Sequence, residues 1–398
     1  MNLIDLIDEN GKLVIPEGVT KIESQAFSDN DNLTAVEIPD SVTEIGDFAF
    51  GDCSKLISVT IPDSVTNIGE GAFIGCESLS SIIVSDNNTK YKSIGNCCLS
   101  KDGDVLIFGC KNSKIPNCVS KIGDSAFYGC RGLTYIEIPS SVTQIGNGAF
   151  GGCRGLTSIE IPSSVTQIGD HAFARCTGLT SIEIPSSVTQ IGNGAFFSCT
   201  GLASIEIPSS VTQIGDSAFY DCTGLTSIEI PSSVTQIGNG AFDGCTGLTS
   251  IEIPSSVTRI GDYAFYGCIG LTSIEIPNSV TQIGDWAFYG YTGSIEIPSS
   301  VTQIGDHAFW SYTGTELTSI EIPACLVEHI VDFIKLIENR LTVRLTEKLP
   351  DNAKDVLRIV YHCNPHFITL KVPAGCGEAY RHHPDFGGRF KEILEVLD

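Results

Sequence analysis

Basic residues are scarce in this chain of 398 residues. It has 23 Lys and Arg against 47 Asp and Glu, which gives a formal net charge of −24. A surface with such an excess of negative charge repels a phosphate backbone. We therefore expect no nucleic acid as a partner, and the charge favours a protein partner, in particular a basic one.

No apolar stretch reaches the length needed to span a membrane, so membrane insertion is not expected. The start, MNLIDLIDENGKLVI, carries acids where a secretory signal needs a basic segment and then a continuous apolar run. These two features predict a cytoplasmic protein. An exported or cell-surface protein is the alternative if the sequence begins after a removed leader.

The usual motifs of enzyme active sites are also missing. The chain has no phosphate-binding loop, no zincin motif and no nucleophile elbow. The C-terminal region contains side chains of metal-binding types, but their spacing matches no recognised metal site. They are His362, Cys363, His366, Cys376, His382 and His383. We expect no catalytic residue, no cofactor and no metal, and a metalloprotein or enzyme centred on this region is the remote alternative.

What the chain has in abundance is one repeated segment, SIEIPSSVTQIG, followed each time by an Ala-Phe pair. The phenylalanines that mark its phase are Phe27, Phe50, Phe73, Phe127, Phe150, Phe173, Phe196, Phe219, Phe242, Phe265, Phe288 and Phe309. Their step is 23 residues, apart from one gap of 54 and a last step of 21. A fixed period of this size predicts a solenoid, in which each coil buries its apolar face against its neighbours.

The coil of residues 179–200 illustrates the repeat. Ile182 and Ile184 flank Glu183, and this alternation predicts a short strand with one buried face. Gly192 follows later in the coil, at a position that we expect to need positive φ.

Nine of the 16 cysteines follow the same phase, three residues after each Phe. They are Cys53, Cys76, Cys130, Cys153, Cys176, Cys199, Cys222, Cys245 and Cys268. A column of thiols inside the solenoid packs like a column of small hydrophobes. We expect these thiols to be buried and reduced, which favours an intracellular protein.

The pattern LTSIEIPSSVTQIGDHAFARC resembles the BspA-type leucine-rich repeat family. The resemblance covers about residues 13–323, where the Ile-Pro, Val, Ile-Gly, Ala-Phe and Cys positions recur together. It implies a right-handed leucine-rich-repeat solenoid, rich in β-structure, with a parallel sheet on one side. Members of the family are known as surface adhesins and host-interaction proteins that are usually exported.

Two segments depart from the repeat. We predict a solenoid over residues 1–323, with a hairpin insertion at about 85–115, where Asp102-Gly103 is a strong turn signal. The run NNTKYKSIGNCCLSKDGDVLIF is similar to the hairpin insert of extended repeats in the family. Residues 324–398 are predicted to be a helix-containing C-terminal capping region, that is, a small α/β cap. Within it, the alternation around Val343 and around Leu370 predicts two further strands.

An extended repeat surface favours binding over catalysis. The predicted function is therefore a non-enzymatic protein–protein interaction scaffold or inhibitor that binds through the solenoid surface. A surface adhesin that binds host or matrix proteins is the alternative that the family resemblance implies.

A column of glutamates provides one candidate surface. It consists of Glu160, Glu183, Glu206, Glu229, Glu252, Glu275 and Glu296, on the outer face of the predicted sheet. This acidic strip is either a docking surface for a basic partner or a solvated face that prevents aggregation.

The second candidate surface lies beside the Ala-Phe pairs. The residues two before and one after each Phe vary from coil to coil, so we expect the coil itself to demand nothing particular there. Toward the C-terminus they become Tyr263, Tyr266, Trp286, Tyr289, His307 and Trp310. Exposed aromatic clusters concentrate interface energy, so these six are the candidate partner-binding residues. Packing between adjacent coils is the alternative interpretation, in which Tyr291 replaces a column cysteine and is buried.

Overall fold

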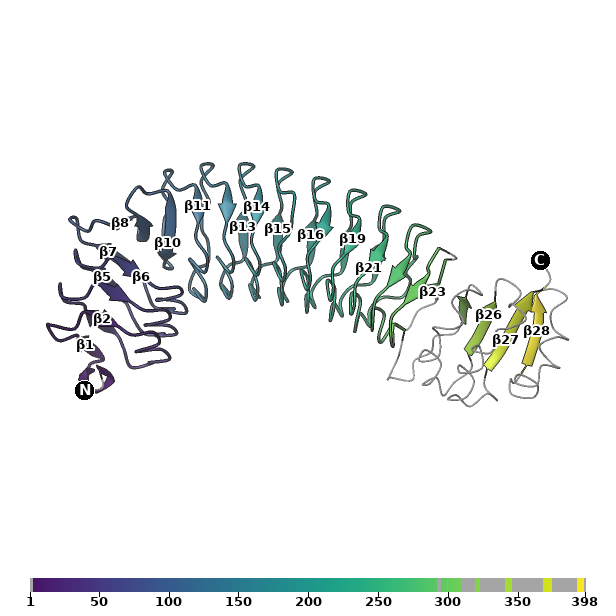
Figure 1. Cartoon of the computed structure of the whole chain (residues 1–398), viewed down its shortest axis with the longest axis horizontal. Coiled ribbons are helices and arrows are strands. Elements are labelled where there is room, and N and C mark those ends of the chain that lie inside the picture. The colour runs from purple at the N-terminus through teal and green to yellow at the C-terminus, as the bar shows by residue number, and fades with distance from the viewer. Residues whose placement is uncertain are drawn as a thin grey trace. The chain divides into compact units, whose positions relative to one another are not determined.

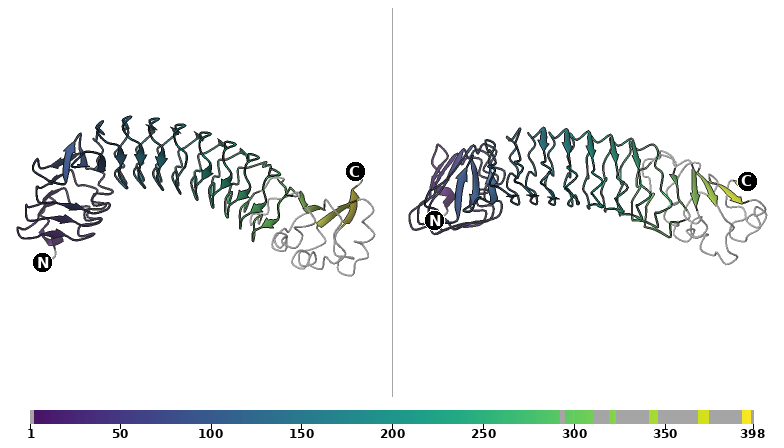
Figure 2. Two further views of the ribbon diagram at one scale, coloured as in Figure 1. Left: turned by 45° about the horizontal axis from the view of Figure 1, so that its top comes forward. Right: turned by 90° about the horizontal axis from the view of Figure 1, so that it is seen from above.

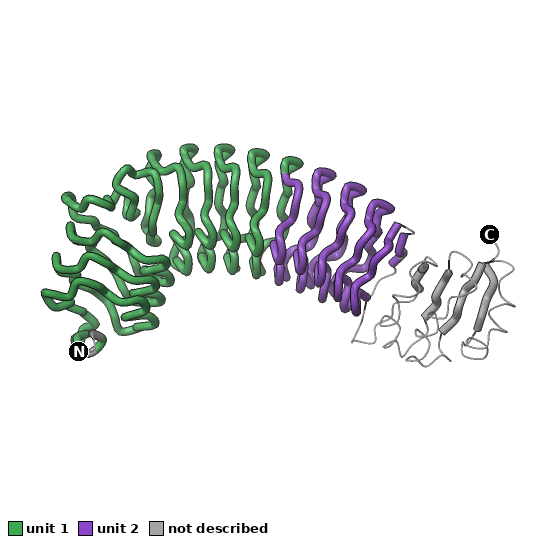
Figure 3. Tube along the Cα trace, viewed as in Figure 1, with its two compact units in different colours: residues 1–210 green, residues 211–398 purple. Residues whose placement is uncertain are grey.

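The computed structural model describes residues 3–291, 295–298 and 300–309, and the backbone of four strands further on. Trp310, the C-terminal His and Cys residues, the expected cap helices and the side chain of Glu296 lie outside the described residues. The chain divides into two compact units, Met1–Ser210 and Val211–Asp398 (Figure 3). Both are β-solenoids, so the predicted fold class is confirmed. The boundary that we place between residues 323 and 324 stays a prediction.

Unit 1 opens with a single 3₁₀ turn, Leu3–Leu6, the one helical element among the described residues. Its coils contribute strands to two series of parallel ladders, one for each side of the coil (Figure 1). The first series comprises β1 (Lys12–Val14), β3 (Ala35–Glu37), β5 (Ser58–Ile61) and β7 (Ser81–Val84), and then β13 (Ser158–Glu160), β15 (Ser181–Glu183) and β16 (Ser204–Glu206). The second series comprises β2 (Lys21–Ile22), β4 (Glu44–Ile45) and β6 (Asn67–Ile68), and then β11 (Lys121–Ile122), β12 (Gln144–Ile145) and β14 (Gln167–Ile168).

Unit 2 repeats this plan. Its first series begins with β18 (Ser227–Glu229) and β20 (Ser250–Glu252). Its second series comprises β17 (Gln213–Ile214), β19 (Gln236–Ile237), β21 (Arg259–Ile260), β22 (Gln282–Ile283) and β24 (Gln303–Ile304). A further parallel sheet contains β23 (Ile295–Glu296), β25 (Ser319–Ile322), β26 (Leu341–Leu345), β27 (Ile368–Pro373) and β28 (Glu392–Val396). The strands expected around Val343 and Leu370 are therefore confirmed as β26 and β27.

The alternation within each strand determines which side chains enter the core. In β15, Ile182 is buried while Ser181 and Glu183 are exposed, and β13 and β16 pair with it in register. Identical residues therefore lie above one another from coil to coil. Stacking buries the apolar face that a single coil would leave in water, and this burial stabilises the solenoid.

A column of phenylalanine rings runs through the core of each unit. In unit 1, the ring centroids of Phe150 and Phe173 are 5.5 Å apart, and the planes differ by 3°. In unit 2, the rings of Phe242 and Phe265 are also 5.5 Å apart. All nine column cysteines are buried, as predicted. Most of these thiols also donate a hydrogen bond to the coil before, as the Sγ of Cys176 does to the carbonyl oxygen of Phe150 at 3.1 Å.

The insertion in unit 1 forms an antiparallel meander. Its strands are β8 (Tyr91–Ile94), β9 (Cys97–Ser100) and β10 (Val105–Gly109), and the turn at Asp102-Gly103 joins the last two. The hairpin does not simply protrude, because β10 pairs in parallel with β11 and so extends the second series. The coils before it and those after it point in different directions within unit 1 (Figures 1 and 2).

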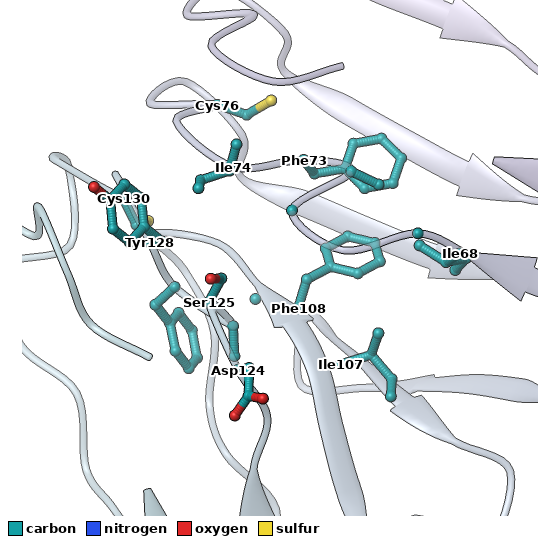
Figure 4. Close-up of a pocket in the computed structure, with 16 residues that line it drawn as sticks. Ile68, Phe73, Ile74, Cys76, Ile107, Phe108, Asp124, Ser125, Tyr128 and Cys130 are labelled. Carbon is teal, nitrogen blue, oxygen red and sulfur yellow. The ribbon is translucent and has the colours of Figure 1, made fainter. Parts of the chain in front are cut away.

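Phe108 of the insertion continues the ring column. Its centroid lies 4.7 Å from that of Phe73, whereas a Cβ on the next residue, Gly109, would lie 2.1 Å from the ring of Phe127. Only glycine therefore lets Phe127 pack here. A small cavity of about 30 Å³ remains where the insertion meets the coil of Phe127, lined by Phe73, Phe108 and Tyr128 among others (Figure 4).

Our expectation for Gly192 is wrong. Gly192 is not among the residues with positive φ. A Cβ on Gly192 would instead lie 2.6 Å from the carbonyl carbon of Gly169 in the preceding coil. Glycine is needed at this position because two backbones approach closely, not because the backbone is left-handed.

Candidate interaction surfaces

The backbone turns left-handed two residues before every phenylalanine of the column. The twelve residues at this position have φ between 54° and 60°. They are Gln25, Phe48, Gly71, Ser125, Gly148, His171, Gly194, Ser217, Gly240, Tyr263, Trp286 and His307. The expectation that the coil demands nothing particular here is therefore wrong: it demands a conformation that most residues avoid.

Hydrogen bonding between coils explains why the backbone is left-handed at this position. The N–H of Tyr263 donates to the carbonyl oxygen of Asp285 at 2.7 Å, and the N–H of Phe265 donates to that of Ala287 at 2.7 Å. Gly267, which is also left-handed, donates to the carbonyl oxygen of Tyr289 at 2.8 Å. Every second N–H group of this segment therefore donates to a carbonyl oxygen of the next coil. The left-handed residues on either side of the phenylalanine orient their N–H groups so that these hydrogen bonds form.

Glycine occupies this position at no steric cost in four of the twelve coils, whereas other L-residues are strained there by about 1–2 kcal/mol. Three successive coils of unit 2 nevertheless place Tyr263, Trp286 and His307 in it, with φ of 57°, 56° and 57°. Unit 2 therefore carries large side chains at a position where the left-handed backbone favours glycine.

The three rings form a stack. The centroids of Tyr263 and Trp286 are 6.2 Å apart with planes 4° apart, and those of Trp286 and His307 are 4.4 Å apart with planes 9° apart. A second stack joins Tyr266 and Tyr289, whose centroids are 4.3 Å apart. The two stacks touch, because Trp286 lies 5.4 Å from Tyr289 in a tilted arrangement. Five of the six predicted aromatic residues therefore form one continuous surface, which we call the aromatic patch.

The aromatic patch is partly open to solvent. Tyr263 is 41% exposed, and the other four residues are half-buried against one another. Burial, together with neighbouring Tyr289, raises the pKa of Tyr266. Tyr291 differs from them, because it is only 3% exposed and takes the place of a column cysteine, as predicted. The patch is thus a surface feature, and Tyr291 belongs to the core.

An aspartate borders the aromatic patch, and sequence reasoning did not find it. Asp243 directly follows its phenylalanine, as Tyr220, Tyr266 and Tyr289 do in other coils of unit 2. Burial and the nearby carboxylate of Asp221 raise the pKa of Asp243 to about 7. The charge next to the patch therefore changes near neutral pH.

The acidic strip is exposed, as expected. Glu160, Glu183 and Glu206 are in-register neighbours in unit 1, and Glu229 and Glu252 are neighbours in unit 2. Their side chains and that of Glu275 point to solvent, while the isoleucine before each is buried. The strip is a regular, monotonous negative surface.

Two features are absent from the ranges that the structure describes. No group of three or more His, Cys, Asp or Glu is placed there to hold a metal ion. In the same ranges, no helix combines the length and apolar character of a membrane span.

Comparisons with known proteins establish the family. The model of the BspA type leucine-rich repeat region matches residues 9–103, 108–226 and 212–332, so the chain belongs to this family. A leucine-rich repeat protein from Bacteroides ovatus is 31% identical with a TM-score of 0.56, and the match covers 84% of this chain and 92% of that one. No curated protein matches the chain.

Two further solved structures are similar. A leucine-rich cell surface protein from Faecalibacterium prausnitzii is 41% identical with a TM-score of 0.49, over 55% of this chain. The match spans only 59% of that protein's length. A leucine-rich repeat protein from Eubacterium ventriosum is 24% identical with a TM-score of 0.46, over 76% of this chain and 82% of that one.

Proposed function

We propose that this protein is a non-enzymatic interaction scaffold or inhibitor that binds a protein partner, with the aromatic patch of unit 2 as its main contact. The observation that carries the proposal is the strained backbone at Tyr263, Trp286 and His307, where glycine serves in other coils. Backbone strain that is retained although a relaxed residue fits is a mark of functional sites.

Two properties of the patch suit a protein partner. Tyr and Trp side chains supply large contact areas with few rotatable bonds, and they are enriched at interface hot spots. Mutual stacking holds the five rings in place before a partner arrives, which lowers the entropy lost on binding. The acidic strip has a different role, since exposed charges mainly raise the association rate with a basic partner and make it sensitive to salt.

The alternative is that the rings merely stabilise neighbouring coils by stacking. The two interpretations differ in what happens when glycine replaces Trp286. If stacking is the purpose, the loss of contacts should lower stability. If the rings serve binding, the relief of left-handed strain should offset much of that loss, so the stability of Trp286→Gly should change little. Its affinity for the partner should fall.

We place the protein in the cytoplasm, as the reduced state expected for its buried column of cysteines favours. A surface adhesin that binds host or matrix proteins is the competing proposal within this family. Fractionation of the source cells distinguishes the two, since an adhesin would appear on the surface and be removed by protease treatment of intact cells.

The decisive experiment compares the partners retained by three forms of the full chain. The wild type, Trp286→Gly and Tyr135→Ser are immobilised, exposed to extract of the source organism and analysed by quantitative mass spectrometry. Tyr135→Ser is the matched control: Tyr135 is a 65% exposed aromatic on the sheet face, where Ser158 and Ser181 stand in later coils.

We expect at least one protein that the wild type and Tyr135→Ser retain equally and that Trp286→Gly loses. With that protein purified, Trp286→Gly should weaken binding by about 2 kcal/mol or more, roughly thirtyfold. Melting of the variant should stay within a few degrees of wild type. Normal binding by Trp286→Gly, with loss in a strip variant such as Glu229→Gln with Glu252→Gln, would move the site to the sheet face.

A further inference from the structure

Unit 1 carries a groove of about 580 Å³ on the edge formed by the left-handed positions. This volume falls within the range of about 300–1,000 Å³ typical of ligand sites. The groove lies at the same backbone positions that carry the aromatic patch in unit 2, but different side chains line it.

The groove arises from a large–small–small–large order in successive coils. The residues that directly follow the column phenylalanines are Tyr128, Gly151, Ala174 and Phe197. Two rings therefore stand at the ends, and two small residues leave the space between them open. Each coil adds 5.2 to 5.6 Å, judged from the spacing of the buried rings beneath.

Glycines set the positions of the rings that form the walls. A Cβ on Gly151 would lie 2.7 Å from the ring of Tyr128, and a Cβ on Gly194 would lie 2.3 Å from the Nδ1 atom of His171. Both rings thus lean over the coil that follows, and they can do so only because glycine is there. His171 and Arg175 also line the groove from left-handed positions, with φ of 54° and 59°.

Carboxylates surround the opening. Glu70, Asp124 and Asp170 line the groove, against the single guanidinium of Arg175. The Oδ1 atom of Asp124 accepts the N–H of Asn147 at 3.0 Å, and the Oδ1 atom of Asp170 accepts the N–H of Asn193 at 2.7 Å. These bonds hold both aspartates in place, so the excess of negative charge stays at the groove.

The walls already accommodate a guanidinium. The Cζ atom of Arg175 lies 5.9 Å from the centroid of the Phe197 ring, and the ring of His171 meets Phe197 edge-on at 6.4 Å. Aromatic faces attract cations, and nearby carboxylates strengthen that preference.

We propose that this groove binds an arginine side chain of a partner protein. A guanidinium is planar and so stacks on the aromatic walls, and it donates two parallel hydrogen bonds to a carboxylate. A neutral ligand such as a sugar would use the rings but leave the three carboxylates uncompensated. The site lies in unit 1 and does not depend on the function proposed for the aromatic patch.

The first test uses the peptide fluorescein-GGRGGRGG-amide, with the dye on the N-terminal amine, and the same peptide with citrulline in place of arginine. Citrulline has nearly the same shape but no charge. Fluorescence anisotropy is measured with the full chain at 0.15 M salt, where distant charges are largely screened, with a Debye length of about 8 Å. We expect the arginine peptide to bind at least tenfold more tightly than the citrulline peptide. Equal binding of the two, or no binding of either, overturns the proposal.

The second test removes two of the groove's three negative charges without changing its hydrogen bonds. Asp124→Asn with Asp170→Asn is suited to this, because the chain itself has Asn147 and Asn193 at the same position of other coils. Glu183→Gln with Glu206→Gln removes two charges from the sheet face and serves as the matched control. We expect about tenfold weaker peptide binding in the first variant and less than twofold change in the second. A similar loss in both would mean that the peptide senses only the overall negative field, and would overturn the proposal.

The third test concerns the walls. Tyr128→Ala and Phe197→Ala introduce the residue that Ala174 supplies in an intervening coil, so folding should be preserved, as a melting curve will verify. Each should weaken the arginine peptide by about fivefold, as expected for the loss of one cation–π contact. Trp286→Gly should leave peptide binding unchanged, which separates a failure of this inference from a failure of the proposed function. Unaltered binding in both wall variants would contradict the inference.

Discussion

The edges of the two units share one backbone and differ only in their side chains. In unit 1, two coils with small residues separate Tyr128 from Phe197, so these two rings border an open groove. In unit 2, two consecutive coils carry Tyr266 and Tyr289, so these rings stack and the space between them is filled. The core beneath is the same in both, with phenylalanine rings 5.2 to 5.6 Å apart. The family's coil thus provides a constant frame on which a few surface positions make either a cavity or a raised patch.

The largest expected effect tests whether the core is really equivalent in the two units. Phe150→Ala in unit 1 and Phe265→Ala in unit 2 each remove one ring from a buried column. Each should lower the free energy of unfolding by about 3–5 kcal/mol, through lost transfer energy and the cavity left behind. Urea denaturation measures both. A change well below this range in either unit would mean that its core relaxes around the gap, and the comparison would fail.

An intermediate effect separates backbone strain from side-chain crowding. Gly194→Ala and Gly240→Ala both place a Cβ at a left-handed position, with φ of 56° and 59°. In unit 2, the Cβ of Gly240→Ala would meet no atom closer than 3.4 Å, so only strain of about 1 kcal/mol applies. In unit 1, the Cβ of Gly194→Ala would collide with the His171 ring at 2.3 Å.

Gly194→Ala should therefore destabilise the protein by about 1–2 kcal/mol more than Gly240→Ala, since the collision adds to the strain. Adding His171→Gly to Gly194→Ala should remove the difference. Thermal melts of the three variants suffice. Equal losses for the two glycines would indicate that His171 moves aside freely and that the wall of the groove is not preset.

The smallest effect concerns pH and is expected at the edge of unit 2, because the residues at the equivalent positions of the groove, such as Gly151 and Ala174, carry no carboxyl group. The pKa of Asp243 rises from 3.8 to about 7 in the folded protein. The unfolded chain releases this proton near pH 4 and the folded chain only near pH 7. The group therefore destabilises the fold progressively as pH rises from about 4 to 7, and fully above that.

Asp243→Asn should remove this penalty. The stabilisation should be about 1 kcal/mol greater at pH 8 than at pH 5, after allowance for partial exposure of the carboxyl. Denaturation curves at the two pH values give the difference. Asp221→Asn should produce part of the same gain, since its charge is the second cause of the raised pKa. A gain independent of pH would refute the assigned pKa.

The sequence was sufficient to predict the elements that repeat. Period 23 predicted the coils, the alternation around Ile182 predicted the strands, and the phase of Cys176 predicted a buried column. The sequence also indicated which aromatic residues would gather, because residues at equal phase lie above one another in any stacked repeat.

The left-handed positions escaped prediction because their occupants vary so widely. Trp286, His171 and Ser217 occupy the same position of the repeat but share no size or polarity, so the sequence indicates no constraint there. Only the glycine in four of the twelve coils indicated positive φ. Gly192 had the opposite effect: glycine recurs at its position because two backbones approach closely there, and not because φ is positive. A glycine signals a restriction, but the sequence does not say whether the restriction is torsional or steric.

The sequence by itself determined the period, the buried columns and the register, because each follows from local alternation repeated at a constant step. Tertiary structure decided where the backbone turns left-handed, how far Tyr128 and His171 lean over the next coil, and how burial, with Asp221 nearby, raises the pKa of Asp243. These features depend on distances between atoms of neighbouring coils. Such distances are set only when the coils stack, so they cannot be predicted from the pattern of residues along the sequence.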